Sequence, residues 1–344
     1  MVPQGDNFSG LDEAPAPDLR EVVGQPVARR ALEIAAAGCH ALLLIGPPGC
    51  GKTMLAERIP GILPGFEEGE ALETAQVYSA AAEPPWPRLI SRRPFRTPHH
   101  TVSPAGLIGG GNPPHPGEIS FAHGGVLFLD EFSEFRREAR EALRQPLESG
   151  EIRIARAGNV FCFPCRFLLV AATNPCPCGN AGHPRRICRC SPPLLSRFGQ
   201  KFSGPLLDRI DLSVSVLPMA GADWCGPASG EASAAVRERV KRCRNVQERR
   251  YSGRFCRANG TVRAPFSELA SHLSPDARAF LTRAADRLSF SGRALGRVCR
   301  VARTIADLSG EKTVSLPHLA EAVQYRLPDF TLHDERKKDP AAGG

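Results

Sequence analysis

The sequence has few aromatic residues, no internal repeat and no long apolar run. No stretch approaches the ~20 apolar residues that cross a bilayer, so we expect no membrane-spanning helix. The first residues carry neither the basic segment nor the apolar core of a secretory signal. We therefore expect a cytoplasmic protein whose 12 cysteines are reduced thiols or metal ligands.

The remaining composition is typical of a globular protein of about two domains. The 344 residues are 42% hydrophobic and 23% charged, which excludes a collagen-like chain, a disordered chain and a small disulfide scaffold. The net charge of +8 is uneven, because nine Lys or Arg residues lie between positions 236 and 260 against two Glu. This block favours an anionic partner such as nucleic acid, with a solvated helix face as the alternative.

Hydrophobic patterning predicts an α/β fold, with a parallel sheet flanked by helices. Three short apolar runs bounded by turn residues predict buried parallel strands, at 41–45, 126–129 and 167–171, and an alternating pattern predicts a fourth strand at 212–216. Helical patterns cover 27–37, 53–59 and 134–147, and 152–163 is typical of a β-hairpin. Residues 83–118 are rich in Pro, Gly and His and lack periodicity, which is typical of a functional insertion.

Changes in composition divide the chain into five parts. We expect a linker at 1–17, an α/β core at 18–220, a basic helical connector at 221–265, a small all-helical domain at 266–332 and a disordered tail at 333–344.

A phosphate-binding loop follows the first predicted strand. Its sequence fits G-x-x-x-x-G-K-[ST] and lies between a strand and a helix, with Met54 directly after it. Glycines let backbone N–H groups approach phosphate oxygens, Lys52 reaches the β- and γ-phosphates, and Thr53 holds Mg²⁺. The loop residues are Gly46, Pro47, Pro48, Gly49, Cys50, Gly51, Lys52 and Thr53, with Cys50 filling space.

Two further strands end in polar residues. Asp130 and Glu131 follow the second strand, where Asp130 is placed to hold Mg²⁺ and Glu131 to act as a base on the attacking water. Asn174 follows the third strand and is placed to orient that water, although Asn-Pro alone is only a turn signal.

Arginines near the fourth strand and in the helical region are candidates for stabilising transition-state charge. Arg209 is placed to act from a neighbouring subunit, and the alternative is a structural pair with Asp208 or Asp211. Arg293 is the candidate γ-phosphate contact from the helical domain, with Arg297 as the second choice.

The cysteines include a paired C-x-C arrangement. Cys176 and Cys178 with Cys188 and Cys190 are candidate ligands of a tetrahedral Zn²⁺, and His183 is a substitute ligand. The alternative is four reduced thiols on a Pro-rich loop. We interpret Cys162 and Cys165, which lie on a predicted strand, as structural.

These motifs, in this order, resemble the AAA+ ATPases, and within them the magnesium-chelatase subunit I-like group and its ComM (YifB) competence-protein subfamily. The resemblance covers about residues 18–330. The most specific strings are PFRTPHHT at 94–101, GEIS at 117–120, GVLFLDEF at 125–132, NPCPCG at 174–179 and SGPLLDRID at 203–211.

The resemblance implies a P-loop AAA+ core followed by a helical lid, and a ring of subunits, a hexamer, that uses ATP and Mg²⁺. It implies a helicase that promotes DNA branch migration in natural transformation, with single-stranded or branched DNA as the substrate. It assigns the Walker B pair to Asp130 and Glu131, sensor 1 to Asn174, the arginine finger to Arg209 and sensor 2 to Arg293. Family members carry an N-terminal Lon-protease-like domain, and we expect this chain to be a form that lacks it.

The insertion and the hairpin resemble elements that face the ring pore in this group. We expect the basic side chains there to meet DNA phosphates without stacking on bases, so that binding is salt-sensitive. The alternative for the histidines is a metal site or packing. The candidates are Arg96, His99, His100, Arg153 and Arg156. Phosphate chemistry alone leaves three functions open, namely a DNA motor, a remodeller of a protein partner and a chelatase motor subunit.

Overall fold

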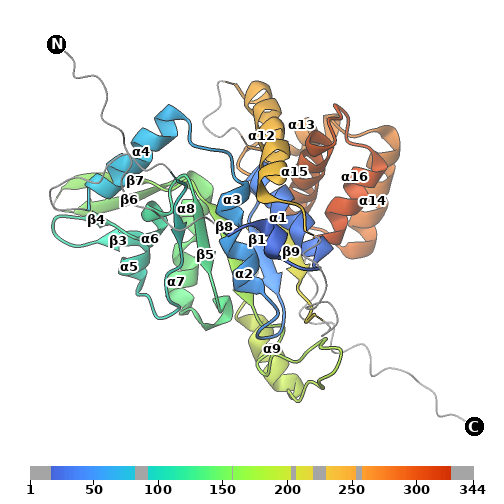
Figure 1. The fold of residues 1–344 in the computed structure, drawn as a ribbon, viewed down its shortest axis with the longest axis horizontal. Coiled ribbons are helices and arrows are strands. Elements are labelled where there is room, and N and C mark those ends of the chain that lie inside the picture. Colours follow the sequence, from blue (N-terminus) through green and yellow to red (C-terminus); the bar gives the residue numbers. More distant parts are fainter. Residues whose placement is uncertain are drawn as a thin grey trace, which may run out of the picture.

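A parallel five-stranded sheet forms the centre of the structure, a computed structural model that describes residues 17–81, 92–156, 158–202, 207–219, 230–252 and 258–326. The strand order is β2-β5-β8-β1-β9, and every neighbouring pair is parallel. The strands are β2 (Phe95–Arg96), β5 (Val126–Leu129), β8 (Leu168–Thr173), β1 (Leu42–Ile45) and β9 (Leu212–Ser215). The expected α/β fold is confirmed, with helices on both faces of the sheet (Figure 1).

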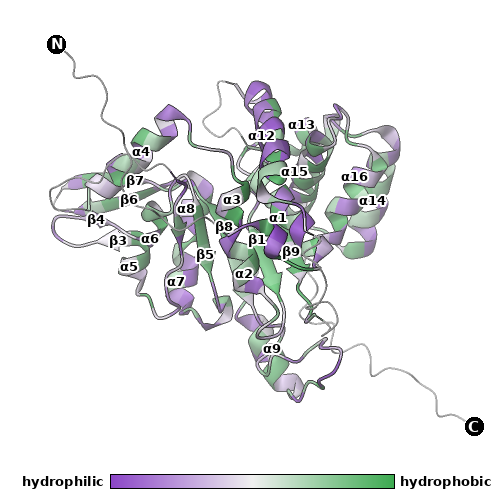
Figure 2. Cartoon of the chain, in the orientation of Figure 1, coloured by the Kyte–Doolittle hydropathy of each residue, from purple (hydrophilic) through white to green (hydrophobic). Residues whose placement is uncertain are grey.

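Alternate residues of each central strand enter two separate cores. In β1, Leu42 and Leu44 join one hydrophobic cluster while Leu43 and Ile45 join the other. The same alternation holds in β5 and β8. Because successive side chains point to opposite faces, a strand buried on both faces is apolar throughout, which explains the unbroken green strands in Figure 2.

Helices of the first half of the chain divide between these two faces. The first face carries α1 (Pro26–Gly38), α2 (Lys52–Glu57) and α3 (Ile59–Ile62). The second face carries α5 (Pro104–Ile108), α6 (Glu118–Phe121), α7 (Arg137–Ala142) and α9 (Pro192–Gln200). None of the helices in the described residues is both long and apolar enough to cross a membrane.

Prolines divide two helices that we expected to be continuous. The helix expected at 53–59 ends at Glu57, and α3 begins at Ile59 with Pro60 in its first turn. The helix expected at 134–147 becomes a 3-10 turn (Phe132–Glu134), α7 and α8 (Arg144–Ser149), with Pro146 in the first turn of α8. A proline ring would clash with the carbonyl four residues earlier, so neither helix can run through.

The insertion at 83–118 contains more structure than its composition indicates. It holds β2, α5 and a short antiparallel pair, β3 (Gly109–Gly110) with β4 (His115–Pro116), and α6 begins at its last residue, Glu118. The described residues around it also include α4 (Glu68–Ser79), which sequence patterning did not predict. The expected β-hairpin is confirmed as β6 (Glu151–Arg156) paired with β7 (Asn159–Pro164).

The C-terminal part of the described chain is helical, as expected. It comprises α12 (Ser233–Arg250), α13 (Phe266–Ser271), α14 (Pro275–Leu288), α15 (Gly292–Leu308) and α16 (Leu316–Gln324). Apolar residues of α12, α15 and α16 belong to the same cluster as α1 and the first face of the sheet. In Figure 1, α1 and α12 lie between the sheet and the outer helices α14 and α16. The expected linker at 1–17 and tail at 333–344 lie outside the described residues, except for residue 17.

Four of the nine basic residues counted at 236–260 bond within the chain, namely Arg237, Arg239, Arg244 and Arg250. Lys241, Arg242 and Arg249 are exposed, so an anionic-partner site and a solvated face both stay open for this block. Arg237 donates to the Gly61 carbonyl at 2.8 Å, and Arg244 donates to the Ala36 carbonyl at 2.8 Å. Arg239 bridges Glu33 and Glu231. These arginines fasten α12 to α1, α3 and the segment before α12, while Arg249 remains exposed.

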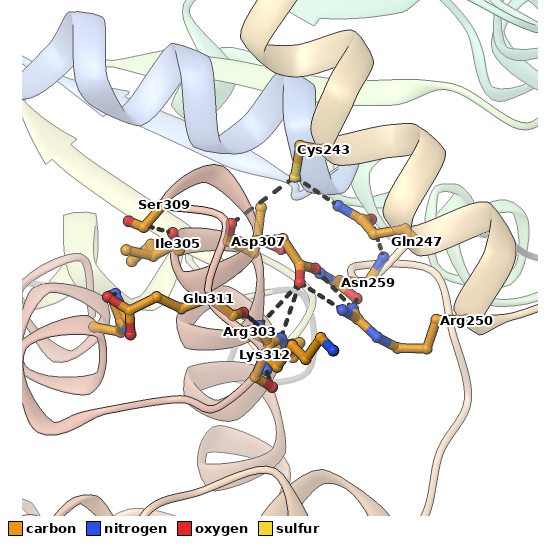
Figure 3. A network of polar contacts seen from close by, with 12 residues as sticks. Cys243, Gln247, Arg250, Asn259, Arg303, Ile305, Asp307, Ser309, Glu311 and Lys312 are labelled. Carbon is orange, nitrogen blue, oxygen red and sulfur yellow. Dashed lines mark hydrogen bonds and ion pairs between the residues drawn. The ribbon is translucent and has the colours of Figure 1, made fainter.

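A buried polar network joins α12 to α15 (Figure 3). The Asp307 carboxylate accepts hydrogen bonds from Arg250 at 2.7 Å, Arg303 at 3.1 Å and Asn259 at 2.9 Å. Gln247 of α12 contributes further bonds, accepting from the Asn259 backbone N–H at 2.8 Å. The network stabilises the helical region against the helix that leads into it.

Candidate functional site

Three neighbouring strands of the sheet end at one cavity. Gly46 follows β1, Asp130 follows β5 and Asn174 follows β8. The cavity has a volume of about 370 Å³. Its lining comprises Pro48, Gly49, Gly51, Lys52, Thr53, Met54, Asp130, Glu131, Thr173 and Asn174. The polar side chains expected from the strand ends are therefore brought together.

Close packing requires glycine at the start of the phosphate loop. A Cβ on Gly46 would meet the Val216 carbonyl oxygen at 2.2 Å and the Cys50 Sγ at 2.6 Å. Gly49 and Gly51 adopt φ values of 77° and 93°, which side-chain-bearing residues rarely adopt. Cys50 is buried against Gly46, which agrees with the space-filling role expected for it.

Lys52 links the phosphate loop to the end of β8. Its ammonium donates to the carbonyls of Gly46 at 2.7 Å and Pro47 at 3.0 Å, and to Asn174 Oδ1 at 3.3 Å. Burial lowers the pKa of Lys52, and the charges of Asp130 and Glu131 act in the opposite direction. Lys52 thus places a positive charge at the cavity. Its ammonium is bonded to uncharged oxygen acceptors, and a phosphate oxygen can take their place.

Thr53 and Asp130 form a donor set suited to a hard cation. The Thr53 hydroxyl donates to Asp130 Oδ2 at 2.8 Å, and Asp130 Oδ1 accepts from the Glu131 backbone N–H at 2.8 Å. Hydroxyl and carboxylate oxygens are ligands that Mg²⁺ prefers. The residues present therefore fit a Mg²⁺ ion between the loop and β5.

Glu131 extends into the cavity from a left-handed backbone position. Its φ is 49°, and its side chain is 60% exposed, so the carboxylate is accessible to solvent. The insertion reaches this group, because His100 Nδ1 lies 3.3 Å from Glu131 Oε2. Of the predicted pore histidines, His100 therefore faces the candidate base, and His99 bonds to Thr101 at 2.8 Å.

The candidate arginines occupy three different environments. Arg209 forms an ion pair with Glu148, a partner that the sequence analysis did not name. Asp208 instead accepts from the buried Arg297 at 3.1 Å. Arg293 is exposed in the first turn of α15 and does not line the cavity. Arg297 therefore anchors the segment that carries Arg209.

The predicted pore residues lie on exposed or half-buried positions. Arg96 pairs with Glu118 through two bonds of 2.8 and 2.7 Å. Arg153 bonds to Glu151 at 2.8 Å on the exposed face of the hairpin. Arg156 is exposed at the hairpin end.

The four predicted zinc ligands converge. The Sγ atoms of Cys176, Cys178, Cys188 and Cys190 all lie within 4.8 Å of one another. Burial raises the pKa of the Cys176 thiol to about 12. At Cys178 burial opposes ionisation, but backbone N–H groups from neighbouring residues lower the thiol pKa to about 6.

Two other candidates lie apart from this cluster. His183 is not a member of the cluster. Its Nδ1 accepts from the backbone N–H groups of Arg185 and Arg186 at 3.0 Å each. Cys165 is buried in the second core, as its structural interpretation requires, whereas Cys162 is exposed.

A second cavity beside the first was not predicted from the sequence. It has a volume of about 550 Å³ and shares Glu131 and Asn174 with the first cavity. Its other wall comes from α9 through Leu194, Arg197 and Phe198. The sequence does carry a signal for α9, the helix that forms this wall. Ser191 followed by two prolines is typical of a helix start, and an amphipathic run follows it.

Comparison with known proteins agrees with this arrangement. The profile of the family described as "Magnesium chelatase, subunit ChlI" matches residues 18–223, and that of "Magnesium chelatase, subunit ChlI C-terminal" matches residues 230–326. The chain belongs to the magnesium chelatase subunit ChlI family. The AAA+ fold expected from the motifs is thereby confirmed, and with it membership of an ATPase family that uses ATP and Mg²⁺ and whose members commonly oligomerise.

Individual relatives fall into two groups. The chain is 48% identical to the competence protein ComM of Haemophilus influenzae over 93% of its own length and 61% of that protein. It is 45% identical to the uncharacterized protein YifB of Salmonella typhimurium over 92% and 61% of the two chains. It is 29% identical to the magnesium-chelatase 38 kDa subunit of Rhodobacter capsulatus over 56% and 57%. The chain thus spans about three fifths of the length of the ComM-type relatives, and the ComM resemblance is confirmed.

Proposed function

We propose that this chain is a Mg²⁺-dependent ATPase that assembles into a homo-oligomeric ring, a hexamer, and uses hydrolysis to move single-stranded or branched DNA, as in branch migration during natural transformation or recombination. The observation that carries the proposal is the meeting of Lys52, Asp130 and Glu131 at one cavity. We assign its location to the cytoplasm.

Five polar side chains of the cavity are assigned a role in γ-phosphate transfer to water. Lys52 leaves its backbone acceptors for the β- and γ-phosphate oxygens and offsets their charge. Thr53 and Asp130 hold Mg²⁺, which supplies further charge neutralisation. Glu131 accepts the proton of the attacking water while the bond between the γ-phosphorus and the leaving ADP oxygen breaks. Asn174 orients that water.

The ring completes the site. We assign Arg209 to the active site of the neighbouring subunit, where it stabilises charge on the transferred phosphoryl group. Arg293 is assigned a contact to the γ-phosphate from the helical lid. The exposure of Arg293 and its absence from the cavity lining favour action across a subunit boundary.

DNA is proposed as the substrate because basic side chains lie on the exposed hairpin, and because the chain resembles ComM over most of its length. We assign phosphate contacts to Arg153 and Arg156, and to Arg96, His99 and His100 of the insertion. The second candidate function is a motor subunit of a chelatase, which the 29% identity to a magnesium-chelatase subunit favours. We further assign Zn²⁺ to the four clustered thiols.

The test is the steady-state ATPase rate with single-stranded DNA, with a four-way junction and without DNA, at low and moderate salt. We expect stimulation by DNA that decreases with salt, and little stimulation in an Arg153→Ser, Arg156→Ser double variant. Lys52→Ala gives the background rate, and an Arg283→Ser, Arg287→Ser double variant, at exposed positions of α14, is the control for loss of two surface charges. ATP turnover that is indifferent to DNA under every condition would refute the DNA motor and favour the chelatase.

A further inference from the structure

The four clustered thiols lie in the segment that directly follows Asn174. Cys176 Sγ lies 3.4 Å from Cys178 Sγ and 3.7 Å from Cys188 Sγ, and Cys178 Sγ lies 3.7 Å from Cys188 Sγ. Disulfide bonds are about 2.05 Å long, so the thiols are not paired covalently. A tetrahedral Zn²⁺ with Zn–S bonds of about 2.3 Å places its sulfur atoms about 3.8 Å apart. The observed separations match that arrangement.

The backbone supports the same geometry. Cys176 is fully buried, and its Sγ accepts the backbone N–H of Ala181 at 3.3 Å. The Gly179 N–H donates to the Cys176 carbonyl at 2.9 Å and closes a tight turn. Backbone N–H groups aimed at cysteine sulfur are the outer contacts that stabilise thiolate ligands in metal sites.

This turn contacts the phosphate loop. Gly179 is buried with a φ of 76°, and a Cβ at this position would lie 2.7 Å from Cδ of Pro48. The segment that carries two of the four thiols therefore packs directly against a residue that lines the nucleotide cavity.

We propose that Cys176, Cys178, Cys188 and Cys190 bind one Zn²⁺ and that this ion, by fixing the turn at Gly179 against Pro48, holds the phosphate loop in its nucleotide-binding conformation. The inference about the loop rests on the ATP site of the proposed function, whereas the inference about the metal does not. Without the ion, no bond links the four thiols. The turn at Gly179 is then no longer fixed against Pro48, and the phosphate loop loses that contact.

Metal content tests the first half of the proposal. The full chain, purified without added chelator, is analysed for zinc and iron by elemental mass spectrometry. We expect about one zinc per chain, lost in the Cys188→Ser, Cys190→Ser double variant and retained in Cys162→Ser, which alters an exposed thiol outside the cluster. Absence of zinc, zinc that survives the double variant, or iron in its place would overturn the zinc assignment.

ATP affinity tests the second half. A fluorescent ATP analogue is titrated into the zinc-loaded chain, into the chain treated with a zinc-selective chelator in excess Mg²⁺, and into the chelated chain after zinc is restored. We expect affinity to fall about 3- to 10-fold on zinc removal and to return with zinc. Gly179→Ala, which disturbs the contact with Pro48 and leaves the thiols intact, should weaken the analogue similarly at unchanged zinc content.

The outcomes separate this inference from the proposed function. If zinc removal and Gly179→Ala leave the affinity unchanged, the coupling is wrong while the ATP site stands. If the zinc-loaded wild-type chain binds no analogue, the proposed function fails, and the coupling fails with it, while the zinc content still decides the metal site.

Discussion

The imidazole of His100 lies 3.3 Å, Nδ1 to Oε2, from the carboxylate of Glu131. His100 belongs to the insertion that we expected to face the ring pore, and Glu131 is the proposed base of ATP hydrolysis. Phe135 packs against the imidazole edge-on, and the His99 ring lies 4.1 Å from it between centroids. A residue proposed to meet DNA thus contacts the group proposed to activate water, which offers a direct path for DNA to alter turnover.

Replacing His100 with Ala should lower kcat about 3- to 10-fold without changing the affinity for ATP. The contact with His100 orients the Glu131 carboxylate, and a base that is misaligned loses rate rather than binding. His100→Asn, which keeps a side-chain N–H donor, should recover part of the rate. The measurement compares kcat with the dissociation constant of ATP in the absence of DNA, with His99→Ala as the control. An unchanged or higher kcat would refute the positioning role.

Glu131→Gln should retain ATP binding and lose at least about 100-fold in turnover, because the amide keeps the shape of the side chain but cannot accept the proton. Phosphate release and nucleotide affinity are measured on the same preparation. Glu138→Gln, at an exposed position on the following helix, is the matched control and should behave as wild type. Turnover near the wild-type rate in Glu131→Gln would contradict the assignment of the base.

Mixing two inactive variants should restore activity if Arg209 acts on a neighbouring subunit. Arg209→Ala alone should lose about 10³-fold or more in turnover, the usual effect of removing such an arginine. In mixed rings, a Lys52→Ala subunit still supplies Arg209 to an Arg209→Ala subunit that has an intact Lys52. The ATPase rate is followed across mixing ratios. Addition of a Lys52→Ala, Arg209→Ala double variant is the control and should restore nothing, and a mixture inactive at every ratio would argue against action in trans.

Asp307→Asn should destabilise the chain by about 3 to 5 kcal/mol, since it leaves buried guanidinium groups without their counter-charge. Asp307 is the common acceptor for Arg250 and Arg303, and its side chain is 1% exposed. The free energy of unfolding is measured by urea denaturation. Asp286→Asn, on the exposed face of α14, should change it by less than about 0.5 kcal/mol. Equal stability of the two variants would show that the network contributes little.

His123 should make stability fall as the pH drops below neutrality. Burial lowers the pKa of His123 from 6.5 to about 4. Its Nδ1 accepts the Arg166 backbone N–H at 3.0 Å, which requires the neutral ring. The neutral form is favoured even though Nε2 faces Glu73. Below about pH 6.5 the histidine of the unfolded chain takes up a proton that the folded chain does not. The free energy of unfolding therefore has its full value above about pH 6.5 and is lower by about 2 kcal/mol at about pH 5. Denaturation of wild type and His123→Gln at about pH 7.5 and 5 measures this. An identical pH dependence in the two proteins would contradict it.

The sequence predicts best those strands that are buried on both faces of the sheet. The bounds of β1, β5 and β8 agree with the apolar runs, and those of β9 with the alternating pattern, to within one or two residues. The phosphate-loop motif and the two strand ends then bring Lys52, Asp130 and Asn174 to one cavity. β2 was missed because it is two residues long and lies between prolines. The contacts of His100 with Glu131, and of Gly179 with Pro48, join segments far apart in the chain, and no local periodicity encodes such contacts.

The helix α1 packs on the sheet with one side and on α12 and α15 with the other, and one apolar cluster runs from the strands to α16. Across the described residues, Cys50 of the phosphate loop and the apolar residues of α16 belong to this one core. We therefore expect a movement of the phosphate loop on ATP binding to be passed through this core to α16. In the ring that we propose, such a movement would shift the helical region together with the sheet, so a substitution that loosens the packing of α1 against α12 would weaken the coupling between ATP binding and the helical region.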